Sequence, residues 1–320
     1  MSFSTPVVFI IFNRPDLTRI VFESIARAKP EKLFVLADGP RFPEEAEKCE
    51  QARAVISKTD WDCEVITNFS DKNMGCGQRV SSGIDWVFSK VEEAIFLEDD
   101  CLPAESFFPY CQALLDRYRD DHRIMTINGN NFQFGQKRTD YSYHFSKYNG
   151  CWGWGSWRRA WKYYDYEMKT WPEFKNSEML GMVCEDPYEQ RFWTSLFDSM
   201  YENPDRENTW DHQWKYACWS QSGLAIEPSV NLVSNLGLGR SDATHTTWYN
   251  PLLEQLWETK EIRQIKHPLF VVRHRAADAY IFDYIVGGNQ MKRNALLNRL
   301  IKWMSVIRKK ASRNRSIPKK

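Results

Sequence analysis

Three consecutive acidic residues, Glu98, Asp99 and Asp100, close a short apolar run that begins at Ala94. Short apolar runs bounded by turn-forming residues are typical of buried strands, so we expect these carboxylates at the carboxyl end of a strand. Ligands bind at that edge of open α/β sheets, and carboxylate oxygens suit a hard divalent cation such as Mg²⁺ or Mn²⁺. The pattern therefore predicts a cation site for an anionic ligand such as a diphosphate, unless the acids only solvate a turn or cap the next helix.

The segments around this triplet alternate between strand and helix patterns. Strands are predicted where apolar, β-branched runs stop at turn residues, and helices where apolar residues recur with helical spacing. The predicted strands are 6–12, 33–37, 64–68, 94–97 and 124–128, and the predicted helices are 16–28, 44–57, 78–89 and 104–118. Such alternation indicates a parallel sheet with right-handed crossovers. Further along, we expect a strand at 143–145, helices over 157–222 and short strand material at 225–233.

Length and composition restrict the class of protein. The chain has 320 residues and a hydrophobic fraction of 42%, which predicts an elaborated α/β domain or a domain with a helical extension. Its eight cysteines include no C-x-x-C pair, so a reduced, cytosolic setting is expected in place of a zinc cage or a dense disulfide framework. We expect neither a signal peptide nor a membrane span, because the N-terminal and internal apolar runs are too short.

The net charge of +1 conceals a strongly basic C-terminal tail. Eleven basic residues and no acid follow Asp283, so the rest of the chain carries a net charge of −10. Residues 289–308 place apolar side chains among lysines and arginines, which indicates a basic amphipathic helix. We expect it to contact an anionic membrane surface, unless it docks on its own domain, and the last eight or so residues to be disordered. The acidic body offers no basic groove for nucleic acid.

Two glycine-containing segments could contact a ligand through a loop. The turn at 71–79 enters a helix and can present backbone N–H groups to an anion, with Arg79 in the first helical turn, although it also fits an ordinary helix entry. The loop at 234–247 contains two glycines and His245, and it is a candidate lid that orders over a bound ligand. A loop histidine is by itself more often simply exposed to solvent.

A third segment, residues 149–157, alternates glycine with tryptophan. Glycine lets the backbone approach a ligand closely, and an indole face packs on the apolar side of a sugar ring. The segment therefore predicts either a wall of a sugar site, with Trp152, Gly153 and Trp154, or an aromatic cluster under a loop. A further candidate is Asp211, between Trp210 and a predicted helix, as either an N-cap or a catalytic carboxylate.

Several of these motifs together resemble the GT-A glycosyltransferases, which use nucleoside-diphosphate sugars, and especially the bacterial family-2-like enzymes. The resemblance covers about residues 5–250. It rests on the first strand with Asn13-Arg14, the strand end Ala37-Asp38-Gly39, Asn73-Met74-Gly75 with Arg79, and Glu98-Asp99-Asp100 in the place of the D-x-D motif. This E-D-D form is similar to that of the Golgi enzyme that adds N-acetylglucosamine to mannose on N-glycans.

The resemblance implies a role for each motif. Asp100 would be the main metal ligand, and His245 would complete the metal shell. Asp211 would be the catalytic base of an inverting transfer, with Asp186 of the Glu185-Asp186 pair in reserve. The residues implied to line the nucleotide-sugar pocket are Asn13, Arg14, Asp38, Asn73, Arg79, Glu98, Asp99, Trp152, Gly153 and Trp154.

The expected fold is α/β of the GT-A, Rossmann-like type, with a mostly parallel central sheet flanked by helices and a C-terminal helical extension. We expect a transferase domain at 1–250, whose nucleotide-binding half is 1–128 and whose acceptor half is 129–250. The helical extension would be 251–288 and the basic tail 289–320.

The expected activity is metal-dependent transfer, with Mn²⁺ or Mg²⁺, of a sugar from a nucleoside-diphosphate sugar to an acceptor hydroxyl. A UDP-sugar donor and a glycan or lipid-linked acceptor are favoured, in surface polysaccharide or lipopolysaccharide synthesis. The protein would be cytoplasmic and peripheral on the inner face of the cell membrane. The alternatives are a sugar-phosphate nucleotidyltransferase and a non-catalytic carbohydrate- or membrane-surface-binding module.

Overall fold

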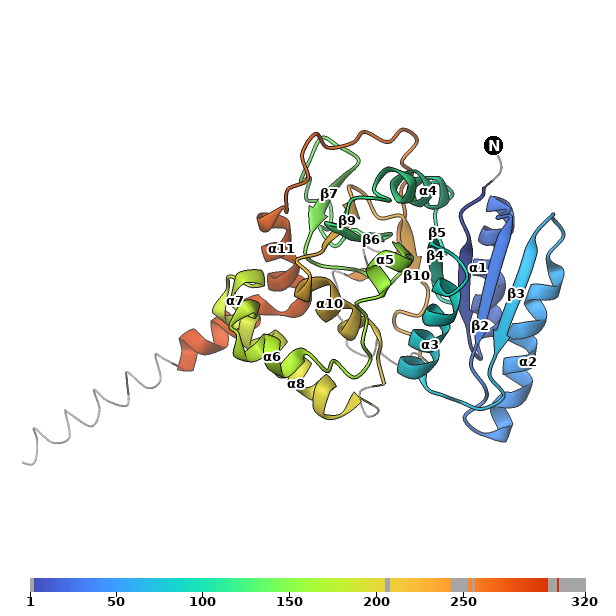
Figure 1. Ribbon diagram of the computed structural model, residues 1–320, viewed down its shortest axis with the longest axis horizontal. Coiled ribbons are helices and arrows are strands. Elements are labelled where there is room, and N and C mark those ends of the chain that lie inside the picture. The colour runs from blue at the N-terminus through green and yellow to red at the C-terminus, as the bar shows by residue number, and fades with distance from the viewer. Residues whose placement is uncertain (1–2, 205–207, 243–252, 255–256, 299–303, 305–320) are drawn as a thin grey trace, which may run out of the picture.

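A central eight-stranded sheet organises the computed structural model, which describes residues 3–204, 208–242, 253–254, 257–298 and 304 (Figure 1). The strand order is β3-β2-β1-β4-β8-β6-β9-β7. The pairs β3·β2, β2·β1, β1·β4 and β6·β9 are parallel, whereas β8 is antiparallel to both β4 and β6, and β7 is antiparallel to β9. The strands are β1 (Val7–Ile11), β2 (Lys32–Ala37), β3 (Glu64–Phe69), β4 (Glu93–Glu98), β6 (Ile124–Asn128), β7 (Tyr143–Ser146), β8 (Trp154–Trp157) and β9 (Leu224–Pro228).

Helices cover both faces of this sheet, and the alternation of side chains along β1 shows why. Val8 and Ile10 belong to a core cluster that includes α3, whereas Val7, Phe9 and Ile11 belong to a second cluster with α1 and α4. A strand buried on both faces is expected to be apolar throughout, as this one is. The first helices are α1 (Pro15–Ala28), α2 (Ala46–Ala54), α3 (Cys76–Phe88) and α4 (Phe107–Arg117), with 3-10 turns η1 (Pro43–Glu45) and η2 (Val55–Lys58) flanking α2. The predicted mostly parallel α/β sheet is confirmed.

The central strand β8 was not predicted from the sequence. It lies between β4 and β6 and is antiparallel to both. Its end residues Trp154 and Trp157 are each 1% exposed, and the Trp154 ring stacks on Phe96 with centroids 4.3 Å apart. Most described tryptophans fill the core in this way; the buried ones are Trp154, Trp157, Trp161, Trp171, Trp193, Trp210, Trp214 and Trp219.

The C-terminal half is largely helical, as predicted for residues 157–222. Its helices are α5 (Arg158–Trp161), α6 (Trp171–Asn176), α7 (Met179–Val183), α8 (Pro187–Glu202), α10 (Asp211–Ser220) and α11 (Arg275–Ile281), followed by the π-helical η4 (Phe282–Val286). A two-stranded ribbon of β5 (Cys101–Pro103) and β10 (Val233–Asn235) joins this half to the end of β4.

The region predicted as a helical extension, 251–288, is only partly helical. Residues 257–274 run without a helix, and helix resumes at α11 and η4. The first part of the basic tail, 288–298, is helical, whereas the end predicted to be disordered lies outside the described residues. In the part of the chain that the structure describes, no helix is both long and apolar enough to cross a membrane.

Candidate functional site

The carboxyl ends of three parallel strands bring several predicted residues to one edge of the sheet. Strand β1 pairs with β2 on one side and with β4 on the other, so that Ile11 lies opposite Ala37 and Ile10 lies opposite Glu98. The residues that follow each strand therefore meet. They are Asn13 and Arg14 after β1, Asp38 after β2, and Asp99 and Asp100 after β4.

Arg14 is ion-paired with two carboxylates of the acidic triplet. Its Nη1 lies 3.0 Å from Asp100 Oδ2, and its Nε and Nη2 donate to the carboxylate of Asp99. Burial and the charges of Asp100 and Asp99 raise the pKa of Glu98 to about 8. Burial also raises the pKa of Asp99 to about 6, against the attraction of Arg14. The carboxylates of the triplet thus disfavour one another's ionised forms, and a cation beside them would offset this repulsion.

The loop after β10 passes close to the carboxylate of Asp100. A Cβ at Gly237 would lie 2.5 Å from Asp100 Oδ2, so glycine permits this approach, and Asn235 Oδ1 accepts a hydrogen bond from the Gly237 N–H at 2.8 Å. The Arg14 guanidinium already holds a positive charge at Asp100. Mg²⁺ is commonly bound through one or two carboxylates together with substrate phosphates and water.

The described residues offer few side-chain ligands for a metal ion at this edge of the sheet. Among residues 3–204, 208–242, 253–254, 257–298 and 304, no three His, Cys, Asp or Glu side chains gather as a metal site. The predicted ligand His245 lies outside the described residues. Asp100 is therefore the described residue that would hold the cation, and the metal itself stays a prediction.

Asp38 and Asn73 hold the turn before α3 against the end of β2. The Asp38 carboxylate accepts hydrogen bonds from the backbone N–H groups of Gly39, Met74 and Gly75 at 2.9 to 3.2 Å. Burial raises the pKa of Asp38, although these N–H groups oppose the shift. Asn73 Nδ2 donates to the Gly39 carbonyl at 2.8 Å. The structure thus brings Asp38 and Asn73 together at this turn. The hydrogen bonds described here join their side chains to backbone groups.

Arg79 is buried and bonds to the ends of two strands. Its Nε donates to the Ala37 carbonyl at 3.1 Å, and its Nη2 donates to the Asn68 backbone carbonyl at 2.5 Å and to the Asn68 side-chain oxygen at 3.0 Å. The side chain is 5% exposed. Arg79 therefore satisfies carbonyls at the ends of β2 and β3, and a direct contact with a nucleotide stays a prediction.

Replacing Arg79 with Met should therefore destabilise the protein. The variant leaves the carbonyls of Ala37 and Asn68 without their buried donor, and we expect a loss of about 2–4 kcal/mol in the free energy of unfolding. Urea unfolding followed by circular dichroism measures it. Arg19→Met on the exposed side of α1 is the matched control and should change the value by less than about 0.5 kcal/mol. Equal stability of the two variants would contradict a structural role for Arg79.

The sequence analysis missed a polar cluster beside Asn13. The Asn13 amide donates to Glu45 Oε1 at 2.9 Å, and Glu45, which is 6% exposed, is ion-paired with Arg41. The hydrogen bond and charge of Arg41 lower the pKa of Glu45 against its burial. The Arg41 guanidinium lies 5.5 Å from the ring centroid of Phe12. In the sequence, the four-residue spacing of Arg41 and Glu45 was the one sign of this ion pair. Exposed ion pairs on helix surfaces have the same spacing, so it does not indicate a functional site.

Asp211 begins α10, and its charge acts on Glu98 of the acidic triplet. Its side chain is 33% exposed and accepts a hydrogen bond from Thr209 Oγ1. Burial alone would raise the pKa of Asp211. The pKa is nevertheless lowered, because the charges of His212 and Lys215 and the hydrogen bond from Thr209 outweigh burial. His212 Nδ1 lies 3.8 Å from Asp211 Oδ2. The charge of Asp211 also contributes to the raised pKa of Glu98. Asp211 is thus an ionised, partly exposed carboxylate near the triplet at neutral pH.

The loop before Asp211 packs tightly on the start of α3. The side chain of Asn208 accepts a hydrogen bond from the Gly77 N–H at 3.0 Å. A Cβ on Gly77 would lie 2.9 Å from the Thr209 carbonyl, so glycine permits this approach. Trp210 stacks on Trp154 of β8 with centroids 5.5 Å apart. The tryptophan core and α3 therefore fix where Asp211 points.

Lys215, one helical turn after Asp211, was not predicted as a site residue. Its side chain is buried, and its Nζ donates to the Asn149 carbonyl at 3.0 Å and to the Asn149 side-chain oxygen at 2.7 Å. The ammonium also lies over the rings of Tyr148 and Trp193. Burial lowers the pKa of Lys215, and Asp211 opposes that shift. The positive charge of this buried lysine, on the same helix, helps to lower the pKa of Asp211.

We therefore expect Lys215→Met to change the pH dependence of turnover. Removing a positive charge disfavours the ionised form of Asp211, so its pKa rises and the acidic limb of the kcat/KM profile moves to higher pH. His212→Gln removes the other nearby charge and should move the limb in the same direction. The profile of initial rates from pH 3 to 9 measures both, because the pKa of Asp211 is lowered from that of an ordinary aspartate. An unmoved acidic limb in both variants would contradict the coupling.

The three residues of the glycine–tryptophan segment differ in what they can contact. The Trp154 ring faces are covered by Phe96 and Trp210, so this side chain packs in the core. Gly153 has φ +66°, and a Cβ there would lie 2.7 Å from Val233 Cγ2. Trp152 is partly exposed, with its ring centroid 5.8 Å from that of Phe132. Trp152 is the one of the three with side-chain surface available to a sugar.

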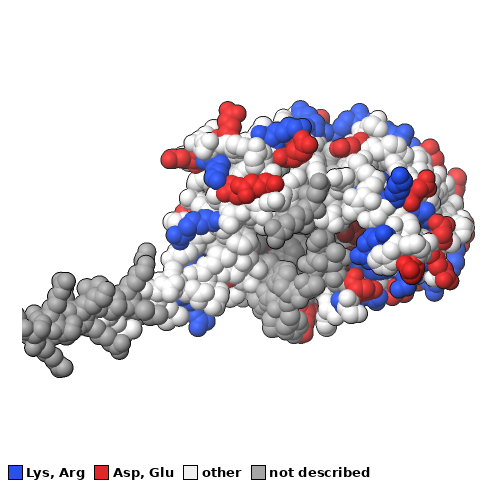
Figure 2. All heavy atoms as spheres, turned by 90° about the horizontal axis from the view of Figure 1, so that it is seen from below, with Lys and Arg blue, Asp and Glu red and all other residues white. Residues whose placement is uncertain are grey.

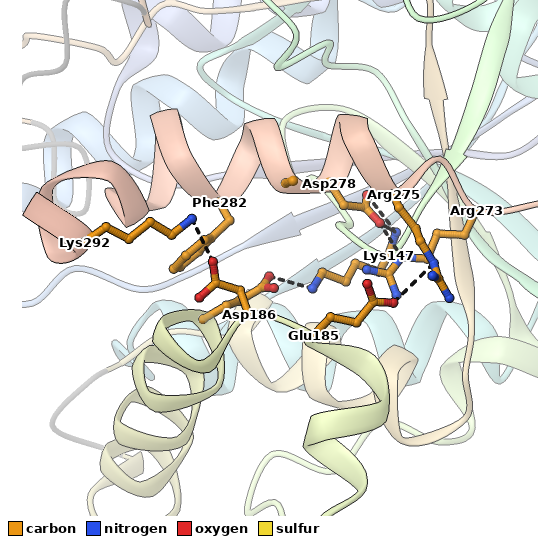
Figure 3. Close-up of a pocket in the computed structure, with 10 residues that line it drawn as sticks. Lys147, Glu185, Asp186, Arg273, Arg275, Asp278, Phe282 and Lys292 are labelled. Atoms are coloured by element: carbon orange, nitrogen blue, oxygen red, sulfur yellow. Dashed lines mark hydrogen bonds and ion pairs between the residues drawn. The ribbon is translucent and has the colours of Figure 1, made fainter.

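Asp186, the reserve base, lies in a different cavity. It caps α8 by accepting from the Tyr188 N–H at 2.8 Å, and it is ion-paired with Lys292 at 2.7 Å. Asp186 and Lys292 line a cavity of about 140 Å³. Figure 3 shows them with other lining residues, which include Lys147, Arg273 and Asp278. The residues of the acidic triplet do not line this cavity. Of the two predicted bases, Asp211 alone is brought to the triplet.

The charged surface shows both signs. On the face drawn in Figure 2, Lys and Arg side chains are interspersed with Asp and Glu side chains. Proteins that bind nucleic acid usually cluster basic residues on one face or along one helix. The expectation that nucleic acid is not a partner stays a prediction.

Comparison with known proteins gives structural neighbours only. No protein-family model matches the chain, and no curated protein matches it. A crystal structure of residues 1–349 of S. aureus TarS aligns over 49% of this chain and 48% of that one, with 12% identity and a TM-score of 0.36. HddC from Yersinia pseudotuberculosis aligns over 53% and 86%, with 10% identity and a TM-score of 0.34. UDP-glucose pyrophosphorylase complexed with UDP-glucose aligns over 70% and 90%, with 8% identity and a TM-score of 0.36. The chain thus spans about half the length of the TarS structure.

Proposed function

We propose that this protein is a glycosyltransferase that moves a sugar from a nucleoside-diphosphate sugar to an acceptor hydroxyl with inversion. The observation that carries the proposal is the ionised, partly exposed Asp211 beside the carboxylates at the end of β4. A proton acceptor next to a cation-binding group is the arrangement that such a transfer needs. The motif resemblance from Asn13 to Asp100 supports the same reading.

The donor is proposed to lie along the edge formed by β1, β2 and β4. Asn13 and Arg14 would face the nucleoside and diphosphate, with Asp99 directed at the ribose or the donor sugar. Asp100 would hold Mn²⁺ or Mg²⁺, which when bound offsets the negative charge that develops on the departing diphosphate. Arg14 would add a second positive charge next to that group. A UDP-sugar is the favoured donor.

The chemistry assigned to the protein itself is proton transfer and exclusion of water. Asp211 would accept the proton of the acceptor hydroxyl as this oxygen attacks the anomeric carbon from the face opposite the diphosphate. Lys215 and His212 would keep Asp211 ionised until then. Trp152 would pack on the apolar face of a sugar ring. Exclusion of water is assigned to the loop that follows β10. This loop passes Asp100, because the Leu236 N–H donates to the Asp100 carbonyl at 2.7 Å.

The acceptor is proposed to be a glycan or a lipid-linked intermediate of surface polysaccharide or lipopolysaccharide synthesis. In this proposal the protein works in the cytoplasm at the inner face of the cell membrane, with its basic tail on anionic lipid. Truncation at Gly288 tests the contribution of the tail. Liposome binding that is unchanged after truncation would remove the tail from the proposal.

A panel of nucleotide sugars, assayed for hydrolysis with and without Mn²⁺, tests the whole proposal. We expect Mn²⁺-dependent release of a nucleoside diphosphate from one donor of the panel. Release of pyrophosphate from a nucleoside triphosphate and a sugar phosphate would identify a nucleotidyltransferase instead. A binding module would turn over no donor, and isothermal titration with UDP and Mn²⁺ would show no heat of binding.

A further inference from the structure

The irregular segment before α11 carries an exposed apolar loop. Leu269, Phe270 and Val272 are 78%, 76% and 70% exposed, although they lie within four consecutive positions. In Figure 1 this part of the chain is the orange-red coil that crosses above β7 between α4 and α11. Single exposed apolar side chains are ordinary on a protein surface, whereas a contiguous group marks an interaction site.

Hydrogen bonds hold the loop in place on the side where the chain enters it. The Ile262 N–H donates to Ser106 Oγ at 3.0 Å, at the start of α4. The Lys266 N–H donates to Ser142 Oγ at 2.8 Å, and the Lys266 carbonyl accepts from the Ser142 N–H at 2.9 Å. His267 Nδ1 lies 2.9 Å from the Tyr143 hydroxyl. These bonds fix the chain up to residue 267 against the start of α4, Ser142 and the first residue of β7.

The other side of the loop is fixed as well. Arg273 forms a parallel bridge with Phe145, and the His274 N–H donates to the Phe145 carbonyl at 2.8 Å. Within the loop, Val271 packs against the core cluster that contains Phe145. With both ends and its centre fixed, residues 268–272 present Leu269, Phe270 and Val272 to solvent as part of the fold.

The charges around the loop are mostly positive. Residues 260–275 contain one acid, Glu261, and that carboxylate accepts a hydrogen bond from the Ser106 N–H at 2.8 Å. The basic residues of the same stretch are Lys260, Arg263, Lys266, Arg273 and Arg275. Arg263 and Lys266 are exposed on the approach to the loop. An apolar group next to exposed cations is the pattern of a segment that enters the headgroup region of an anionic membrane.

We propose that residues 268–272 insert Leu269, Phe270 and Val272 into the interface of an anionic lipid bilayer. Lys260, Arg263 and Lys266, which precede the loop, face the anionic headgroups. Arg273 and Arg275 after it are ion-paired with Asp278 and Glu185. The bonds to Ser142 and Phe145 set the depth of insertion. The positive charge favours a lipid surface over a second copy of this chain, because two copies paired at this loop would bring like charges together. The contact is separate from the basic tail.

Vesicle sedimentation with the full-length chain tests the proposal. The probes are phosphatidylcholine vesicles with and without phosphatidylglycerol, and the variant combines Leu269→Ser, Phe270→Ser and Val272→Ser. We expect the wild-type chain to bind the anionic vesicles and the variant to bind them about tenfold or more weakly. Met179→Ser with Met182→Ser is the matched control, because these side chains of α7 are 53% and 83% exposed. This control should bind as the wild type does.

Three outcomes would overturn the proposal. One is equal binding of the loop variant and the wild type, which would assign the contact to other residues. Another is a wild-type chain that binds neither kind of vesicle. The third is self-association in sedimentation equilibrium without vesicles that the loop variant abolishes, which would make a second copy the occupant. None of these readouts involves sugar transfer, so they leave the proposed transfer reaction unaffected; the absence of any vesicle binding would also remove the proposed membrane contact of the basic tail.

Discussion

Asp211→Asn should reduce the turnover of sugar transfer by about 10²-fold or more, while the affinity for the donor nucleotide stays nearly unchanged. Asparagine keeps the size of the side chain and can still accept a hydrogen bond from Thr209 Oγ1, but it cannot take a proton from the acceptor. Because the donor is proposed to contact β1 and β4, its binding does not require the charge of Asp211. Initial rates and isothermal titration of UDP with Mn²⁺ measure the two quantities separately.

Asp186→Asn is the matched control for this experiment. Asp186 caps α8 and is ion-paired with Lys292, and it lines the cavity of Figure 3. Asparagine is also a good N-cap, so the variant should keep its fold and its turnover. Near-normal turnover of Asp211→Asn together with a large loss in Asp186→Asn would move the base to Asp186.

The sheet edge could be predicted from the sequence because its signals are local. The strand ends at Ala37 and Glu98 are apolar runs that stop at polar turn residues, and parallel pairing follows from their alternation with helices. That pairing alone places Arg14 beside Asp100. The sequence could not reveal the ion pair between them, because each side chain also fits a solvated turn.

The second half of the site could not be predicted because it depends on tertiary packing. Strand β8 is short and antiparallel, and its glycine and tryptophan residues have no strand periodicity. Residues 149–157 therefore predicted either a wall of a sugar site or an aromatic cluster under a loop. The position of Asp211 depends on Trp210 against Trp154 and on the contact between Asn208 and Gly77. Lys215 looks like any other helical lysine in the sequence, and only the burial of α10 makes its charge important to Asp211.

Asp100→Ala should abolish the dependence of donor binding on a divalent cation. In the wild type we expect saturating Mn²⁺ to tighten UDP binding by about 10²-fold, because a metal bridge to the diphosphate contributes several kcal/mol. The variant lacks the carboxylate that faces Gly237, so its weak affinity for UDP should be the same with and without Mn²⁺. Isothermal titration in both buffers gives the two affinities directly.

Two measurements show whether Asp100→Ala loses the Mn²⁺ effect through misfolding: its thermal unfolding midpoint and the behaviour of the control variant Asp242→Asn. Arg14 keeps its ion pair with Asp99 in the Asp100→Ala variant, so the end of β4 retains a counter-charge and the thermal unfolding midpoint without metal should change little. Asp242→Asn removes an exposed carboxylate further along the loop that passes Asp100, and it should keep the full Mn²⁺ effect. Undiminished UDP binding by Asp100→Ala at saturating Mn²⁺ would show that Asp100 does not hold the cation. Arg14, which is already paired with both carboxylates, would then be the described positive charge closest to the diphosphate.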